Sequence, residues 1–287
     1  METAQFAQFF ARQGYRTLKT ESSHWYEIQP FCWQSIPYHR LVEPSSTEIS
    51  QLFFKNFSFL IRYPSQSRHD ALPGYIWVCD CRDYGLTALE TKTRNQVRRG
   101  LEQNAIARVD FALLPQLGWE LITDTAGRQA RNADFAIQPE WARYCAAAAG
   151  IQDFEAWGAY SNGRLAAFLV GAKVDSYYYI LQQASMTAYL KNYPNNALIY
   201  YVTKLKKSDH EIQVVSYGLD SVEDTVGLRK FKEGMGFSRR PLNQKILVNP
   251  LVRWVKRQKV VSFVTCLLRA RPQNNFLRKL VAILNQL

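Results

Sequence analysis

The chain has 287 residues, of which 47% are hydrophobic and 14% aromatic. This composition supplies enough apolar material for a sizeable core, and it excludes disordered, collagen-like and disulfide-scaffold proteins. The length fits one large domain or two modest ones. The formal net charge of +12 predicts attraction to phosphate-rich or anionic partners.

The positive charge is concentrated at the C-terminal end. The stretch from Pro250 to Leu287 holds eight basic residues and no acidic one, so the other 249 residues carry only +4 of the total. The basic residues of this stretch are Arg253, Lys256, Arg257, Lys259, Arg269, Arg271, Arg278 and Lys279. The tail therefore makes the protein basic.

Cysteine usage and the N-terminus both favour a cytoplasmic location. Five cysteines at irregular spacing argue against a secreted disulfide framework. The N-terminus lacks the basic start and apolar run of a signal peptide, and no stretch reaches the roughly 20 apolar residues that span a bilayer. Cys79 and Cys81 would share one face of a strand. We interpret them as core residues rather than metal ligands, because no histidine or further cysteine is near in sequence.

In the first third of the chain, β-like segments alternate with turns. Ser45 offers an N-cap before a helical run that includes Ile49 and Leu52. Residues 57–63 and 75–81 have strand patterns. A helix is predicted over 86–103 and a short strand over 106–111.

The middle of the chain has the clearest signals. Asn162-Gly163 is a strong hairpin turn between predicted strands 154–160 and 165–172. The remaining expected elements are helices 117–131 and 139–149, a third antiparallel strand 177–184, a polar loop 185–196, a helix 197–207, a strand 212–217, a helix 222–235 and a strand 239–248.

Three stretches in this order carry a family resemblance. Residues 92–99 form a basic helix, residues 189–199 lead from a loop into a helix, and residues 227–237 place Phe231-Lys232 before Gly236-Phe237. The succession resembles the GNAT acyltransferase superfamily and, in detail, its FemABX-like branch. The resemblance implies an α/β fold with a mixed, mainly antiparallel central sheet flanked by helices. It also implies a degenerate GNAT-like N-terminal half over 1–117, an acyltransferase domain over 118–250 and a basic amphipathic helical tail over 251–287.

The helix expected at Ala197 suits an anionic donor group, because a helix N-terminus presents unpaired N–H groups and a partial positive charge. The residues expected to bind the donor are Lys191, Asn192, Tyr193, Asn195, Asn196 and Lys232. A plain N-cap is the alternative role for Asn195 and Asn196. Acetyltransferases of the superfamily usually have a glycine-bearing loop here, whereas residues 185–196 contain no glycine. The resemblance implies acyl-CoA as the donor, with aminoacyl-tRNA, which the FemABX-like branch uses, as the other possibility; no metal is expected.

N-acyl transfer needs an uncharged amine, a group that holds the oxyanion and a proton path to the leaving group. We expect Tyr217 as the acid, Asp220 as the base or amine ligand and Gln183 at the reacting centre. The alternative for Gln183 is that its amide bonds to groups at the sheet edge, and the alternative for Tyr217 and Asp220 is that they cap a loop. Arg94, Arg98 and Gln182 are expected to bind the acceptor. The two arginines lie one helical turn apart and can clamp a phosphate or carboxylate, unless they form a solvated helix face.

The resemblance implies an N-acyltransferase that moves an acyl or aminoacyl group onto an amine of a cell-envelope or polysaccharide precursor. A non-catalytic GNAT-like binding or scaffold protein in envelope assembly is the alternative, because the glycine loop is missing. Residues 251–287 are predicted to form two helices broken at Pro272. They would either bind an anionic membrane surface, with the enzyme peripheral to its inner face, or pack on the core. No DNA partner is expected.

Overall fold

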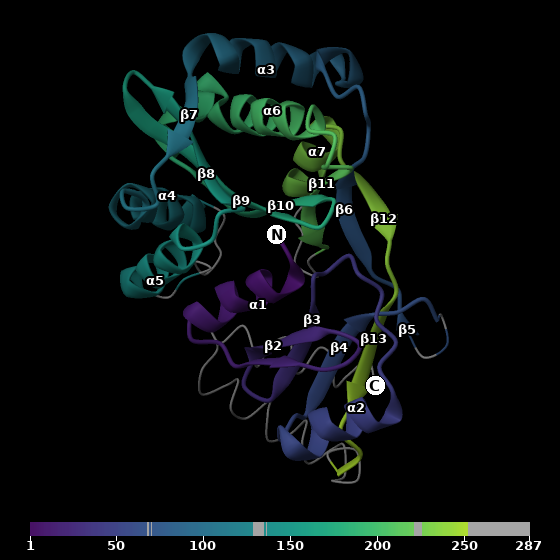
Figure 1. Ribbon diagram of the computed structural model, residues 1–287. Coiled ribbons are helices and arrows are strands. Elements are labelled where there is room, and N and C mark those ends of the chain that lie inside the picture. Colours follow the sequence, from purple (N-terminus) through teal and green to yellow (C-terminus); the bar gives the residue numbers. More distant parts are fainter. Residues whose placement is uncertain (68, 70, 129–134, 136, 221–225, 252–287) are drawn as a thin grey trace.

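The computed structural model describes residues 1–67, 69, 71–128, 135, 137–220 and 226–251. These residues form two sheets, one of six strands and one of seven, with helices on their faces (Figure 1). The expected fold class is confirmed, because both sheets are mainly antiparallel and are flanked by helices. The tail helices expected after residue 251 lie outside the described residues.

The six-stranded sheet is built from the N-terminal part of the chain and one late strand. Its order is β1 (Thr17–Lys19), β2 (His24–Gln29), β3 (Cys32–Ile36), β4 (Leu60–Pro64), β13 (Gln244–Val248) and β5 (Ala71–Leu72). Trp25, Trp33 and Ile61 share a buried cluster with Leu52 and Phe53. The last two residues belong to the short π-helix η1 (Gln51–Lys55), which continues α2 (Ser46–Ser50). On another side, helix α1 (Thr3–Arg12) packs against β2 and β3.

The seven-stranded sheet contains the predicted hairpin and the strand that follows it. Its order is β12 (Ser238–Pro241), β6 (Tyr75–Cys79), β11 (Val214–Leu219), β10 (Tyr177–Ser185), β9 (Arg164–Val174), β8 (Phe154–Ser161) and β7 (Ala105–Val109). Helices α3 (Thr91–Gln103), α6 (Pro194–Lys207) and α7 (Val226–Gly234) lie on one side of it. Helices α4 (Leu114–Arg128) and α5 (Gln138–Ala149) lie on the other (Figure 1).

The meander β8–β9–β10 confirms the hairpin prediction. Asn162 and Gly163 both have positive φ, at 50° and 75°, as a two-residue type I′ turn requires. Strands β9 and β10 are antiparallel neighbours. The N-cap prediction is also confirmed: the Ser45 hydroxyl accepts from the Glu48 amide at 3.2 Å, and the Glu48 carboxylate accepts from the Ser45 amide at 2.9 Å.

Two expectations about elements were wrong, and one helix was missed. The single strand predicted over 239–248 is two strands in different sheets. Pro241 has no N–H to continue the ladder, and the chain crosses to the other sheet with the Leu242 amide bonded to the Gly74 carbonyl at 2.8 Å. Helix α1 was not predicted, although its buried Phe6, Phe9 and Phe10 are spaced as on a helix face. Strand β6 ends at Cys79, so Cys81 is exposed and does not share its strand face.

The two sheets also exchange segments. Strands β6 and β7, from residues 75–109, belong to the seven-stranded sheet, whereas β13 returns to pair with β4 in the six-stranded sheet. The division of the chain at residue 117 stays a prediction. Over the part of the chain that the structure describes, no helix combines the length and apolar character needed to span a membrane.

Candidate functional site

The candidate site lies where β10 and β11 part. These two strands are parallel neighbours only from Tyr177–Tyr179 against residues 214–216, and β10 then continues to Ser185 paired with β9 alone. Each strand has an irregularity at this point. The register of β10 shifts at Leu181 and that of β11 at Tyr217, which is followed by Gly218 with φ 74°. Bulges of this kind re-aim side chains and are frequent beside functional sites.

Polar side chains connect the parted ends in one chain of hydrogen bonds. The Tyr217 hydroxyl donates to Gln183 Oε1 at 3.2 Å, and Gln183 Nε2 donates to Asn195 Oδ1 at 3.0 Å. Asn195 Nδ2 then donates to the Ser185 hydroxyl oxygen at 2.9 Å. Three residues expected at the site from sequence, Tyr217, Gln183 and Asn195, are therefore brought together. Burial raises the pKa of Tyr217 far above its ordinary value, so the phenol stays protonated at neutral pH.

The start of α6 borders this chain and has an unusual backbone. Tyr193 precedes the helix in the left-handed region, at φ 51° and ψ 42°, and Pro194 opens it. Gly100 of α3 lies against this turn, and a Cβ on it would be 2.7 Å from the Tyr193 carbonyl oxygen. Asn104 Nδ2 donates to the Asn192 carbonyl at 2.7 Å. The end of α3 therefore holds the segment that leads into α6.

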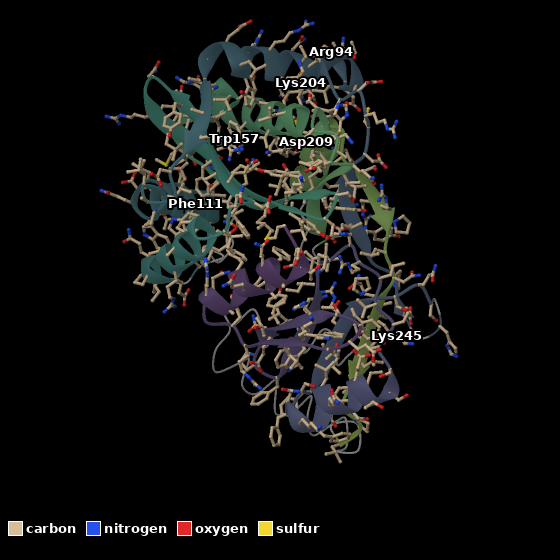
Figure 2. All side chains as sticks on the ribbon, viewed as in Figure 1. Arg94, Phe111, Trp157, Lys204, Asp209 and Lys245 are labelled. Atoms are coloured by element: carbon tan, nitrogen blue, oxygen red, sulfur yellow. The ribbon has the colours of Figure 1, made fainter. Side chains whose placement is uncertain are left out.

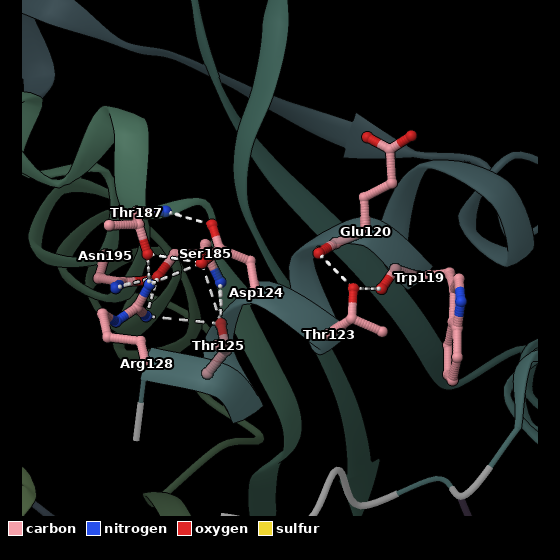
Figure 3. A network of polar contacts seen from close by, with 9 residues as sticks. All are labelled: Trp119, Glu120, Thr123, Asp124, Thr125, Arg128, Ser185, Thr187 and Asn195. Atoms are coloured by element: carbon pink, nitrogen blue, oxygen red, sulfur yellow. Dashed lines mark hydrogen bonds and ion pairs between the residues drawn. The ribbon is translucent and has the colours of Figure 1, made fainter. Parts of the chain in front are cut away.

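A second polar network, which sequence reasoning missed, anchors the end of β10 to α4 (Figure 3). Thr125 Oγ1 accepts from the Ser185 amide, and Arg128 donates to the Ser185 carbonyl at 3.2 Å and to the Thr187 hydroxyl at 2.7 Å. The Asp124 carboxylate accepts from the amide and the hydroxyl of Thr187, each at 2.6 Å. Burial alone would raise the pKa of Asp124, but its hydrogen bonds to Thr187 and the charge of Arg128 lower it below the ordinary value. The spacing of Asp124, Thr125 and Arg128 on one helix face is visible in the sequence, but their partner lies about 60 residues later.

Lys232 and Asp220 lie on the β6 side of Tyr217. The ammonium of Lys232, a side chain buried to 7% exposure, is 4.9 Å from the ring centre of Trp77 and 5.6 Å from that of Tyr217. The Asp220 carboxylate accepts from Trp77 Nε1 at 2.8 Å and pairs with Arg239 at 2.8 Å. Both oxygens of Asp220 therefore have partners within the protein.

The other expected donor-binding residues are spread over neighbouring elements. Asn196 Nδ2 donates to Gln96 Oε1 of α3 at 3.4 Å, and Asn192 Nδ2 donates to the Ser161 hydroxyl at 2.7 Å. Lys191 is exposed on the 3₁₀ helix η3 (Thr187–Asn192). The structure does not bring these three side chains into the Tyr217–Asn195 chain.

The expected acceptor-binding residues also separate. Gln182 shares a strand face with Ala184, whose side chain belongs to the cluster on the α4 and α5 side, so Gln182 points away from Gln183. Arg94 donates to the carbonyl of Leu89, which lies just before α3, at 2.9 Å, whereas Arg98 is exposed one turn later. Figure 2 labels Arg94 on α3 and Lys204 on α6. Within the described residues, no group of three or more His, Cys, Asp or Glu side chains could hold a metal ion.

The fold matches those of solved structures, although no family model and no curated protein matches the sequence. The crystal structure of FemX superposes with a TM-score of 0.60 at 12% identity, covering 88% of this chain and 93% of that one. The C-terminal domain of a putative lysylphosphatidylglycerol synthetase from Agrobacterium fabrum gives 0.57 at 10% identity, covering 84% and 86%. L-PGS from Bacillus licheniformis gives 0.54 at 13% identity, covering 84% and 90%.

The chain has a FemX-like fold. This confirms the resemblance that the sequence stretches carried. At 10–13% identity the likeness establishes the fold and no residue role.

Proposed function

We propose that the protein is an N-acyltransferase that moves an acyl or aminoacyl group onto an amine of a cell-envelope or polysaccharide precursor. The observation that carries the proposal is the parting of β10 and β11 with Tyr217, Gln183 and Asn195 hydrogen-bonded across it. The transferase class is supported by the shared fold with FemX and with two lysylphosphatidylglycerol synthetase structures. The acceptor class rests on that likeness alone, and the proposed location is the cytoplasmic side of the envelope.

The parted strands suit an extended acyl donor. Between Tyr179 and Ser185, the edge of β10 away from β9 has no β11 residue opposite it, so its backbone amides and carbonyls can pair with an inserted chain. The pantetheine arm of coenzyme A carries two amides that can make such bonds, and the start of α6 at Asn195 can receive the phosphates beyond it. We therefore favour acyl-CoA over aminoacyl-tRNA as the donor.

Tyr217 is the best-placed acid. Its raised pKa keeps the phenol protonated at neutral pH, so it can donate a hydrogen bond to the tetrahedral oxyanion. It passes its proton to the departing thiolate as the phenolate takes up the proton that the attacking amine loses. Gln183 already accepts from this phenol at 3.2 Å. A bound thioester would replace Gln183 as the acceptor of that proton. In this scheme Asp220 positions Trp77 and Arg239, because its oxygens are already engaged by them.

Thermal unfolding with candidate donors tests the proposal. A donor at about 100 times its Kd stabilises the folded state by about 2.7 kcal/mol, so acetyl-CoA or a longer acyl-CoA should raise Tm. Gln183→Leu should remove most of that rise, whereas the matched variant Gln182→Leu, on the opposite strand face, should keep it. The same panel includes total aminoacyl-tRNA.

Two results would contradict the proposal. No rise in Tm with any acyl-CoA or aminoacyl-tRNA would contradict donor binding. A rise in Tm without transfer of the acyl group to any amine-bearing envelope precursor would instead favour the non-catalytic binding protein, which the glycine-free stretch 185–196 also suggests.

A further inference from the structure

The exposed phenylalanines gather at one end of the six-stranded sheet. Among the described residues, four phenylalanines expose more than a third of their surface, and all four lie here. Ile28 lies near the end of β2, before the turn that contains Phe31, and Leu251 lies where the described chain ends; both are also exposed. We call this group the aromatic tip; its members are Ile28 (40% exposed), Phe31 (41%), Phe54 (49%), Phe57 (72%), Phe59 (47%) and Leu251 (63%). In Figure 1 the tip belongs to the end of the molecule that carries α2, away from α3 and α6.

The backbone of the tip is firmly held, so the rings are displayed on a rigid frame. The Phe59 amide donates to the Phe31 carbonyl at 2.7 Å, and the two rings lie 4.7 Å apart. Asn249 donates from its side chain to the Ser58 carbonyl at 2.9 Å and from its amide to the Phe59 carbonyl at 2.9 Å. These bonds tie three separate segments of the chain together.

Phe57 shows that the display is not a by-product of core packing. Its φ of 51° is a left-handed conformation that a bulky side chain adopts only at an energetic cost. Its ring remains 72% exposed, so no burial compensates for that strain, whereas Leu52 and Phe53 earlier in the same segment are buried. Backbone strain of this kind concentrates at functional positions, and a contiguous exposed apolar patch marks an interaction surface.

The charges around the tip favour an anionic partner. Lys55 is exposed within it, and the nearby Glu27 carboxylate already accepts from the Phe31 amide at 2.7 Å and from Arg16 at 3.4 Å. Immediately after Leu251 the sequence continues into residues 252–287, which carry eight basic residues and no acidic one. Aromatic and aliphatic side chains beside clustered Lys and Arg are the composition of segments that lie in the interface of an anionic leaflet.

We propose that the aromatic tip docks on an anionic phospholipid surface, with its phenylalanine rings inserted at the headgroup level and the exposed Lys55 at the same leaflet. The inference is independent of the proposed acyl transfer, because it uses none of the residues between β10 and β11. It places the six-stranded sheet, rather than the seven-stranded one, against the membrane.

Vesicle co-sedimentation of the full chain tests this docking. Wild type should sediment with vesicles of equal phosphatidylglycerol and phosphatidylcholine and not with pure phosphatidylcholine. The double variant Phe54→Ser/Phe57→Ser should bind the anionic vesicles at least about tenfold more weakly, because two rings no longer leave water. Leu113→Ser is the matched control: Leu113 is 55% exposed but lies before α4, beside the other sheet, and its loss should leave vesicle binding unchanged.

Thermal unfolding without vesicles completes the test. The double variant should unfold within about 2 °C of wild type, because side chains that are already exposed contribute little to stability. Equal vesicle binding by wild type and the double variant, or no binding by wild type, would overturn the proposal. A clear fall in Tm would also overturn it, because it would show that the two rings pack within the protein rather than stand exposed.

Discussion

The two halves of β10 satisfy their polar groups in different ways. The first half, Tyr177–Tyr179, has β9 on one side and β11 on the other, and the His39 ring stacks on Tyr177 at 3.8 Å. The second half, which ends at Ser185, keeps only β9, and its Ser185 and Gln183 side chains accept hydrogen bonds from α4, α6 and β11. A strand can separate from its neighbour when side chains, rather than the neighbouring backbone, make the hydrogen bonds. The side chains that do so here include Gln183, Asn195 and Tyr217, which form the proposed site.

The largest effect should come from Tyr217 in the parted half. Tyr217→Phe removes only the hydroxyl that bonds Gln183 at 3.2 Å. If this phenol supplies the proton in acyl transfer, turnover should fall by about 100-fold or more, while Tm changes little because one hydrogen bond is worth about 1 kcal/mol. Steady-state acyl transfer measures the first effect and calorimetry the second.

Tyr177→Phe is the matched control in the paired half. It also removes one hydroxyl, which accepts a hydrogen bond from Arg240 at 3.0 Å. Tyr177, however, lies in the part of β10 that still pairs with β11. Its turnover should equal that of wild type. Equal losses in both variants would mean that the two halves do not differ in function.

The paired half should be the less tolerant of added volume. A Cβ on Gly171 of β9 would lie 2.1 Å from the Tyr178 hydroxyl oxygen, and Tyr178 is fully buried. Gly171→Ala should therefore lower the free energy of unfolding by about 3 kcal/mol. Gly227→Ala on α7, where a Cβ would meet open space, is the control in denaturant titration and should cost nothing. A loss under about 1 kcal/mol for Gly171→Ala would show that this half repacks easily.

The contacts of His39 make the paired half sensitive to acid. His39 Nδ1 is 2.6 Å from the Tyr179 hydroxyl oxygen, and Nε2 is 3.4 Å from the Asp175 carboxylate. Burial lowers the pKa of His39 to about 4, outweighing the opposite pull of Asp175, with Arg40 adding to the fall. Because the unfolded chain takes up this proton near pH 6.5 and the folded chain near pH 4, stability is complete above pH 6.5 and is lost as the pH falls toward 4.

Comparing wild type with His39→Gln isolates this contribution from the carboxylates that titrate in the same range. The wild-type free energy of unfolding should drop by about 2 kcal/mol more than that of His39→Gln between pH 7 and pH 4.5. Urea titrations at the two pH values give the difference. Parallel losses in the two proteins would mean that His39 is not neutral in the folded state.

The smallest effect should appear at the border of the parted half. A Cβ on Gly100 would lie 2.7 Å from the Tyr193 carbonyl oxygen and 3.0 Å from the Ala197 side chain. Gly100→Ala should therefore cost about 1–2 kcal/mol, although the same change in an open helix stabilises. The α6 start should shift with it, so the donor-induced rise in Tm should also shrink. An increase in the free energy of unfolding would contradict this, because it would mean that α3 and α6 are far enough apart to accommodate the added methyl group.

The sequence predicted elements well where the signals are local. Asn162-Gly163 specifies its turn through the positive φ of both residues, and Ser45 with Glu48, three residues later, specifies the start of a helix. Both signals involve only residues that are neighbours in sequence. The split of 239–248 between two sheets depends on pairing with β4 and β6, strands more than 150 residues away. Such pairing leaves little trace in local pattern.

The candidate site was predictable in part for the same reason. Gln183, Asn195 and Tyr217 follow from the order of strands and helices, because strand ends meet where the sheet parts. Asp220 was expected to face the reaction, but its pairing with Arg239 depends on β12 crossing to β6. Arg128 and Thr125 were missed because their bonds to Ser185 arise only when α4 packs on β10.

Amide hydrogen exchange with bound donor tests most directly whether the parted half of β10 is the binding site. The protein is compared free and saturated with the acyl-CoA, or the aminoacyl-tRNA, that raises its Tm most. We predict slower exchange in residues 180–186, 193–197 and 217–219, and unchanged exchange in residues 177–179, which already pair on both sides. Protection confined to other segments, with these three unchanged, would contradict the account.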